Sequence, residues 1–267
     1  MKKVTLFLAA FLIAGAVKAQ DSVTLDMQLL PSKKYDQVSA QNMQIEMAYG
    51  GESKKMDMSI SMKGNILTDK AEKGMIPVKM NMSMSMGMKM EGMPDNVTDN
   101  KIDIYGKVKQ GEFVPVFDSI VAQDMPSTAK QAAMDMVKEM LTKVSYPKKT
   151  LKIGETFVQD VPMDIPLGGG AMKMNNVVTY KLIRVEGKKA YFDVIHDISM
   201  DGDLEEGMNM KGSGKGKGEM VYDIDTKYPV VYNADMDMIM QMEQGGMSIS
   251  VKMNTKIAQA TTVGKGK

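Results

Sequence analysis

Apolar and polar residues alternate along most of this chain, a pattern typical of strands with one buried face. The alternation covers residues 56–62, 78–90, 101–108, 113–119, 176–185, 190–200, 218–225, 233–243 and 247–257. Turn sequences separate these segments, for example YGGES at 49–53 and EQGG at 243–246. Because parallel strands need long crossover connections, many strands joined by short turns predict an antiparallel sheet.

One segment near the middle of the chain has helical spacing instead. Its apolar residues recur at intervals of three and four between Ala129 and Val144, and Pro147 ends the run. This spacing predicts one central amphipathic helix over about 127–144.

The stretches on either side of the predicted helix are similar to each other. Residues 29–47 and 151–167 both have an aliphatic start, a polar turn, an aromatic residue (Tyr35 or Phe157) and then alternating Met and Ile. Two interpretations remain open, a duplicated β unit and chance similarity among strands. The predicted fold is mainly β, a curved antiparallel sheet or half-barrel, with two similar β halves under the first interpretation.

The first residues have the features of a secretory signal peptide. Lys2 and Lys3 precede an apolar run, residues 4–16, that is shorter than the ~20 residues needed to span a membrane. Val17 and Ala19 are small residues at the spacing of a cleavage site. We therefore expect a signal peptide (1–19), an N-terminal β half (20–125), a helix and linker (126–146), a C-terminal β half (147–260) and a disordered tail (261–267).

The sequence after the predicted cleavage site indicates a soluble protein of the periplasm or the extracellular space. No later apolar stretch is long enough to be a transmembrane segment. The chain contains no cysteine, which excludes disulfides, thiolate chemistry and a lipid anchor attached through cysteine. Removing Lys2, Lys3 and Lys18 from the 34 basic residues leaves 31 against 33 acidic residues, a net charge of −2. That balance argues against nucleic acid as a partner, since binding phosphates needs a basic surface.

Methionine is the most distinctive feature of the composition, with 32 in the chain. In VKMNMSMSMGMKME (78–91) and NADMDMIMQME (233–243) it occupies every second position, so each row lies on one face of a strand. The rows comprise Met80, Met82, Met84, Met86, Met88 and Met90, and Met236, Met238, Met240 and Met242.

Three interpretations of these rows remain open. They can be an ordinary apolar core built from an adaptable side chain. They can line a binding surface for an apolar ligand, because methionine is frequent at surfaces that accept varied partners. They can also supply thioethers to a soft ion such as Cu(I) or Ag(I). The residues considered for that metal site are Met56, Met58, Met84, Met86, Met238 and Met240.

The sequence contains other candidate sites, but they offer fewer ligand or catalytic groups. His196 shares a strand face with apolar residues in AYFDVIHDISM, which predicts a core histidine satisfied by a hydrogen bond. The segment KGSGKGKGE (211–219) lacks the spacing of a phosphate-binding loop, and its alternating glycines predict a curved strand or an edge hairpin. Catalysis needs convergent titratable groups, and a chain with one histidine and no cysteine offers few, so we predict no enzymatic activity.

Several phrases of the second half resemble a known group of proteins. They are LKIGETF (151–157), VTYKLIRVEGKKAYFDV (178–194) and GSGKGKGEMVYDIDTKYPVVYNADM (212–236). They resemble a family of exported, β-rich bacterial envelope proteins classed as a domain of unknown function, and the resemblance covers most of residues 25–258. By shape, the family suggests the curved, half-open sheets of periplasmic lipoprotein carriers.

Together these observations predict an exported, non-enzymatic binding or carrier protein. Its ligand would be a lipid, an acyl chain or an apolar peptide segment held on the methionine faces, with no cofactor. The first alternative is a Cu(I)- or Ag(I)-binding envelope protein, with Cu(I) as its cofactor. The second is a structural envelope protein with a methionine-rich core. The sequence does not predict an oligomeric state.

Overall fold

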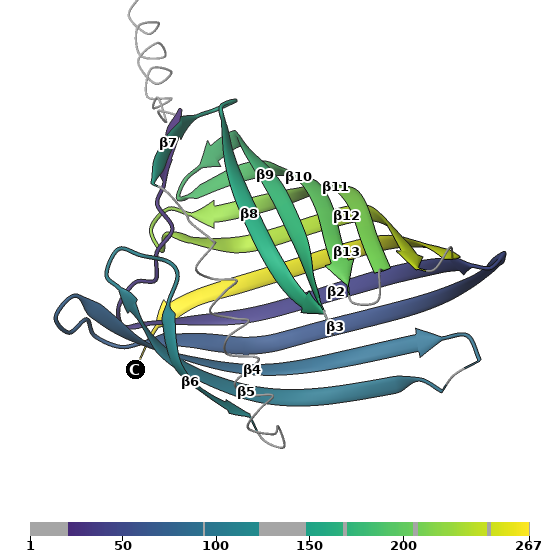
Figure 1. Cartoon of the computed structure of the whole chain (residues 1–267). Helices are drawn as coiled ribbons and strands as arrows, with labels where there is room; N and C mark the ends of the chain where they lie inside the picture. The colour runs from purple at the N-terminus through teal and green to yellow at the C-terminus, as the bar shows by residue number, and fades with distance from the viewer. Residues whose placement is uncertain are drawn as a thin grey trace, which may run out of the picture.

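The protein is mainly β, as the alternation predicts. The computed structural model describes residues 21–92, 94–122, 148–167, 170–204, 208–244 and 247–266. These residues form thirteen strands, eleven of them in one antiparallel sheet (Figure 1). The described part of the chain contains no helix, and the helix predicted over 127–144 lies outside it. Among the described residues, no helix is long and apolar enough to span a membrane.

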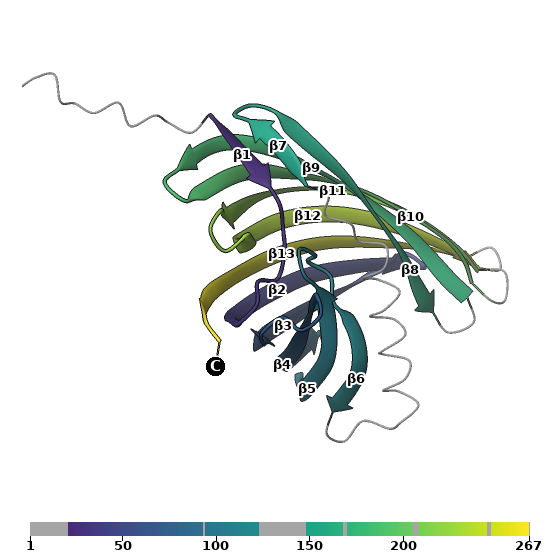
Figure 2. The same ribbon diagram turned by 90° about the vertical axis from the view of Figure 1, so that its left-hand side faces the viewer.

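The large sheet consists of two meanders that meet in the middle. The first meander contains β2 to β6 and the second contains β8 to β13, and they join where β13 pairs with β2. The order across the sheet is β6 (Val116–Ala122), β5 (Asn96–Lys109), β4 (Met75–Met90), β3 (Glu52–Thr68), β2 (Lys33–Tyr49), β13 (Met247–Lys265), β12 (Tyr228–Gln244), β11 (Met208–Asp223), β10 (Lys189–Leu204), β9 (Gly170–Glu186) and β8 (Thr156–Leu167). Strands β6 and β8 are its two edges, so the sheet is open, and it is visibly curved (Figure 2).

Short hairpins set the register of the meanders. In the first, Tyr49 pairs with Glu52, which leaves Gly50 and Gly51 as the two-residue loop between β2 and β3. Their φ angles are +58° and +85°. A two-residue hairpin loop with two positive φ angles strongly favours glycine, so this sequence specifies the turn.

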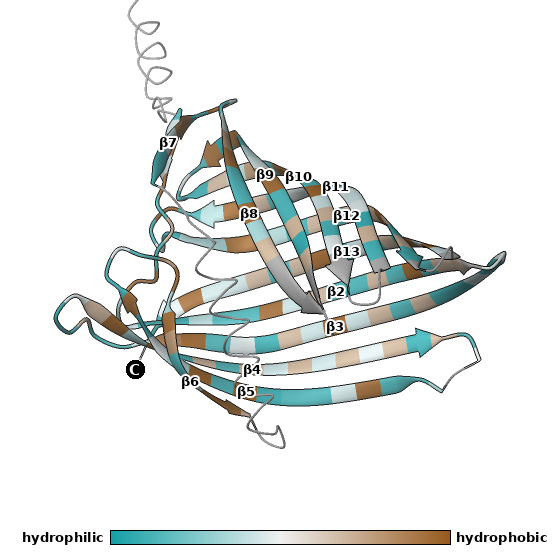
Figure 3. Cartoon of the chain, viewed as in Figure 1, coloured by the Kyte–Doolittle hydropathy of each residue, from teal (hydrophilic) through white to brown (hydrophobic). Residues whose placement is uncertain are grey.

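Pairing across the sheet brings the methionines of neighbouring strands onto one face. Directly opposite residues share a face, and Met56 lies opposite Met90, as Met58 does opposite Met88. We call this side the methionine face. The other side, the opposite face, carries Lys, Asp, Ser and Gln, and the alternation is visible along the strands (Figure 3).

A second, two-stranded sheet and the chain that follows it cover one end of the methionine face. Strand β1 (Ser22–Leu25) pairs with β7 (Lys149–Lys152), and Val23, Leu25 and Leu151 pack on buried residues of β8 to β11. The chain after β1 then crosses the ends of the large strands (Figure 2). Leu29 of this segment belongs to a second core, together with Tyr35, Ile66, Ile76, Val78 and Val108 of the first meander and Tyr228 of β12.

Tyrosine hydroxyls and one carboxylate hold this crossing segment in place. The Tyr222 hydroxyl donates to the carbonyl oxygen of Asp26 and accepts from its N–H, and the Tyr35 hydroxyl accepts from the N–H of Leu30. The Asp26 carboxylate lies 2.8 Å from Nζ of Lys227 and 3.6 Å from Nζ of Lys148. Burial alone would raise the pKa of Asp26, but the hydrogen bond and charge of Lys227, aided by Lys148, lower it below its ordinary value.

One sequence-based expectation is wrong at the C-terminal end of the chain. Residues 261–265 of the predicted disordered tail belong to β13, where Thr261 pairs with Gln37 and Val263 with Tyr35. The local sequence does not predict this part of the strand, because its residues are mostly small or polar. Its pairing partner, β2, is far away in the sequence. For the glycine segment 211–219, the prediction left a strand and an edge hairpin open; the segment lies in β11, an interior strand, which excludes the edge hairpin.

Candidate functional site

The residue types of the methionine face change along the strands. On β4, Ile76 and Val78 are buried, whereas the methionines from Met80 to Met90 are partly exposed. On β10, Phe192 and Val194 are buried and Met200 is partly exposed. Branched and aromatic residues therefore build the covered end of the face, and methionines occupy the other end.

Strand β11 leaves room for side chains from its neighbours. Gly212, Gly214 and Gly216 lie on the methionine face, opposite Met240, Met238 and Met236 of β12. A Cβ atom at Gly214 would come within 2.5 Å of Cγ of Met238, and one at Gly212 within 2.8 Å of the ε-methyl of Met200. The methionine side chains thus lie over the bare glycine strand from both sides.

The result is a cavity lined almost entirely by thioether side chains. Its volume is about 380 Å³, within the range of small-molecule sites. Met210 and Val251 are buried and the other lining residues are partly exposed. The lining comprises Met172 and Met174 of β9, Met200 of β10, Met210 of β11, Met238 and Met240 of β12, and Val251 and Met253 of β13. Its chemistry suits an apolar molecule or a soft ion, and it offers no group for acid–base catalysis.

A small polar cluster separates this cavity from the aromatic core. His196 is buried, with its Nδ1 3.2 Å from Oδ1 of Asn176 and its Nε2 2.6 Å from the hydroxyl of Tyr232. These contacts fit a neutral ring, in which Nδ1–H donates to Asn176 and Nε2 accepts from Tyr232. Burial lowers the pKa of His196, which also favours the neutral form. The prediction of a core histidine held by hydrogen bonds agrees with this geometry.

The histidine predicts a specific dependence of stability on pH. The unfolded chain takes up a proton near the ordinary histidine pKa of 6.5, whereas the folded chain does so only at lower pH. Stability from this group is therefore full above pH 6.5 and falls as the pH drops from there towards the folded pKa. Urea unfolding from pH 7.5 to 5 should show this loss, and His196→Gln should flatten that part of the profile. An unchanged slope in the variant would exclude His196 as its source.

Of the site residues predicted from the sequence, two line the cavity and the others lie outside its lining. Met238 and Met240 line the cavity. The six methionines from Met80 to Met90 lie on the same face of β4 but outside the cavity lining, beside Met56, Met58 and Met62 of β3. Met236 lies over Gly216, and Met242 lies opposite Met210.

Five of the cavity methionines were not predicted as site residues from the sequence. They are Met172, Met174, Met200, Met210 and Met253. None of them belongs to a long methionine row, so only the pairing of β9 to β13 brings them together. The glycine alternation of 212–218 is the signal that marks this region, because a bare strand face needs large neighbours to fill it.

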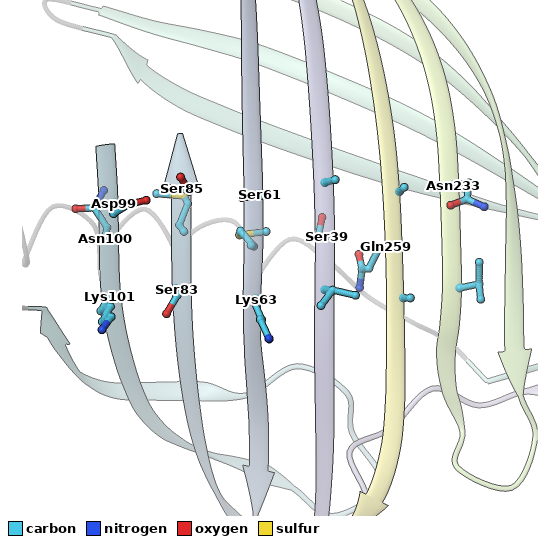
Figure 4. Close-up of a pocket in the computed structure, with 17 residues that line it drawn as sticks. Ser39, Ser61, Lys63, Ser83, Ser85, Asp99, Asn100, Lys101, Asn233 and Gln259 are labelled. Atoms are coloured by element: carbon cyan, nitrogen blue, oxygen red, sulfur yellow. The ribbon is translucent and has the colours of Figure 1, made fainter. Parts of the chain in front are cut away.

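A second, larger groove of about 740 Å³ lies mainly on the opposite face, across β5, β4, β3, β2, β13 and β12. Figure 4 shows its labelled side chains, in which Ser83 lies between Lys63 and Lys101 on the neighbouring strands. Met62 and Met84 also contribute atoms to its wall. Most of its lining is small or polar, which distinguishes it from the methionine cavity.

In the described ranges, no group of three His, Asp or Glu side chains is placed to hold an ion, so an alternative metal site would depend on thioethers. Of the six methionines considered for a soft ion, Met238 and Met240 share the cavity. Met56 and Met58 face Met90 and Met88 on the neighbouring strand.

No protein-family model matches the chain, and no curated protein sequence matches it either. Its function must therefore be inferred from the cavity and the chemistry of the cavity lining.

Proposed function

We propose that this protein is an exported, non-enzymatic carrier that binds an apolar ligand on its methionine face, with the cavity over β11 as the primary site. The observation that carries the proposal is the lining itself, seven methionines and one valine around about 380 Å³. An acyl chain fits this lining best, since it needs dispersion contacts along its length and no hydrogen-bond partners inside the cavity.

The use of methionine supports a binding role over a purely structural one. Leu, Ile, Val and Phe form well-defined packing, and the covered end of the same face uses them. Methionine is unbranched and adaptable, so a face built from it can fit flexible apolar chains of different shapes. The partial exposure of Met174, Met200 and Met240 leaves them available for contact with a ligand.

The finer fold prediction, a half-barrel of two similar β halves, is part of this proposal. The open order of the sheet is compatible with a half-barrel. Strands β2 and β8 each begin a meander, and the aromatic residues Tyr35 and Phe157 near their starts are both buried. This arrangement favours duplication over chance similarity between the two stretches.

Export and the family resemblance complete the proposal. The basic start, apolar run and small residues of 1–19 support cleavage after Ala19 and delivery to the periplasm or the extracellular space. The resemblance to exported envelope proteins points the same way. Intact-mass measurement of the protein from its own envelope fraction should give a chain beginning at Gln20, and a chain retaining Met1 would contradict export by cleavage.

A negative charge placed in the cavity should weaken ligand binding. Met240→Glu puts a carboxylate among thioethers with no Lys or Arg in the lining, and it repels the carboxylate of palmitate, so it should weaken binding of palmitate by at least about tenfold. Equilibrium dialysis with radiolabelled palmitate measures this loss, and thermal melting checks that the variant folds.

The matched control is Gln241→Glu, one residue away on the opposite face of β12. It adds the same charge to the same strand outside the cavity and should leave palmitate binding unchanged. Equal losses in both variants, or no binding by the wild-type protein, would contradict the proposed function.

A further inference from the structure

The methionine cavity has a second chemical property besides being apolar, because its lining concentrates seven thioether sulfurs. Thioethers are soft, neutral ligands that select ions such as Cu(I) and Ag(I) over hard ions. No Asp, Glu or His belongs to the lining, so hard divalent ions find no partner there. We propose that the cavity binds one soft monovalent cation through thioethers that converge above Gly212.

The register of four adjacent strands brings the candidate sulfurs together. Met174 lies opposite Met200, Met200 opposite Gly212, and Gly212 opposite Met240. These residues form one row across β9, β10, β11 and β12 on the methionine face. Because neighbouring strands are ~4.8 Å apart, the backbones of Met200 and Met240 are separated by roughly twice that distance.

Gly212 makes convergence across that separation possible. The ε-methyl of Met200 already lies 2.8 Å from where a Cβ on Gly212 would be, and Cα of Met240 lies 3.4 Å from the same point. Any larger residue would separate the two thioethers. Each methionine has three flexible side-chain torsions, so Met200 and Met240 can turn their sulfurs towards a shared ion above the glycine.

Further thioethers can complete the coordination from the same cavity. Met174 borders Met200 directly, and Met238 lies over the next glycine of β11, Gly214. A monovalent ion is the appropriate charge for such a site, since neutral ligands leave the whole ionic charge in an apolar cavity and a divalent ion would cost far more. The proposed ion site goes beyond the apolar-ligand function and does not depend on it.

The other methionine group of the sheet provides an internal comparison. Met58 and Met88 face each other on β3 and β4, with no glycine between them, and both lie outside the cavity lining. Met88 is 37% exposed, so an ion there would compete with bulk water. If only the number of methionines mattered, this pair would contribute as much as Met200 and Met240.

Titration with Ag(I) in a nitrate buffer tests the proposal, with binding followed by calorimetry and by NMR of ¹³C-methyl-labelled methionine. The wild-type protein should bind one Ag(I), with shifts of the Met200 and Met240 methyl resonances. The double variant Met200→Leu/Met240→Leu should lose at least about tenfold in affinity, and Met58→Leu/Met88→Leu should stay within about twofold. Thermal melting of both variants checks the fold, which leucine should preserve because it is similar in volume.

The outcomes separate this proposal from the apolar-ligand function. No Ag(I) binding by the wild type, or equal losses in the two double variants, would overturn the ion site. Neither result would affect palmitate binding, because leucine keeps the cavity apolar. Conversely, if palmitate fails to bind while Ag(I) binds as described, the carrier function is wrong and the ion site stands.

Discussion

Replacing Gly218 with alanine is expected to lower the free energy of unfolding by about 3 kcal/mol, the upper end of typical overpacking costs. A Cβ atom at this position would lie 3.2 Å from Cα of Ala234 and still closer to the carbonyl oxygen of Asn233. Both contacts are with the backbone of β12, which cannot move aside as a flexible side chain could. The added methyl group must therefore push β11 and β12 apart where Gly218 pairs with Ala234. Urea denaturation of the two proteins measures the difference.

Gly264→Ala is the matched control for this substitution. Gly264 also lies in a strand, β13, where it pairs with Lys34 of β2, but a Cβ atom there would meet nothing within 4 Å and its φ is not positive. Alanine loses less chain entropy on folding than glycine, so this variant should be as stable as wild type or more stable by up to about 1 kcal/mol. If the two substitutions have equal effects, the close approach of β12 to β11 at Gly218 is wrong.

The glycine strand connects the fold to the candidate site. Gly218 allows the close approach of β12, and Gly212, Gly214 and Gly216 leave a bare surface over which methionines from β10 and β12 lie. One alternation of Gly with Lys or Ser in the sequence therefore serves two purposes, tight strand packing near the core and a cavity farther along. The lysines of the same segment are exposed on the opposite face.

Much of the sheet follows from local sequence. Alternation identifies the strands from β3 to β5 and from β9 to β13, because a strand with one apolar face has the same period of two wherever it lies. The hairpin at Gly50 and Gly51 is equally local, since its conformation depends on two residues. Short turns predict that successive strands pair, as they do within both meanders.

Other parts of the fold depend on contacts between distant residues. The pairing of β13 with β2 joins residues near both ends of the chain, and no turn sequence predicts this pairing. Residues 261–265 form a strand because β2 lies beside them, not because of their own composition. The short strands β1 and β7 likewise depend on each other across more than a hundred positions of sequence.

The candidate site was only partly predictable for the same reason. Period two assigns Met238 and Met240 to one face, and the cavity contains both. The period cannot indicate which other strands lie beside these two residues. The sequence therefore does not show that Met174 and Met200 lie next to each other and near the same cavity. Conversely, the longest methionine row lies on β4, six strands away from β10 in the sheet order, and contributes nothing to the cavity lining.

Truncating a core residue and truncating a candidate binding residue of the same strand should change the free energy of unfolding by very different amounts. Ile76 and Met86 both lie on β4 and on the methionine face, but Ile76 is fully buried and Met86 is partly exposed. Ile76→Ala should lower the free energy of unfolding by about 3–4 kcal/mol, because it leaves a cavity among Tyr35, Val78 and Val108. Met86→Ala should cost only about 1 kcal/mol, since much of its contact surface is not lost from a packed core.

This pair of variants decides whether the methionine rows are core or surface. A methionine that packs as a core residue loses about 2–5 kcal/mol on truncation to alanine, as isoleucine does. Urea denaturation of both variants under the same conditions gives the two values on one scale. Comparable losses would mean that the row on β4 is structural, as the second alternative for this protein requires. A large difference would leave the methionines of β4 as an exposed apolar surface whose packing the fold does not need, which is the property that a ligand-binding face must have.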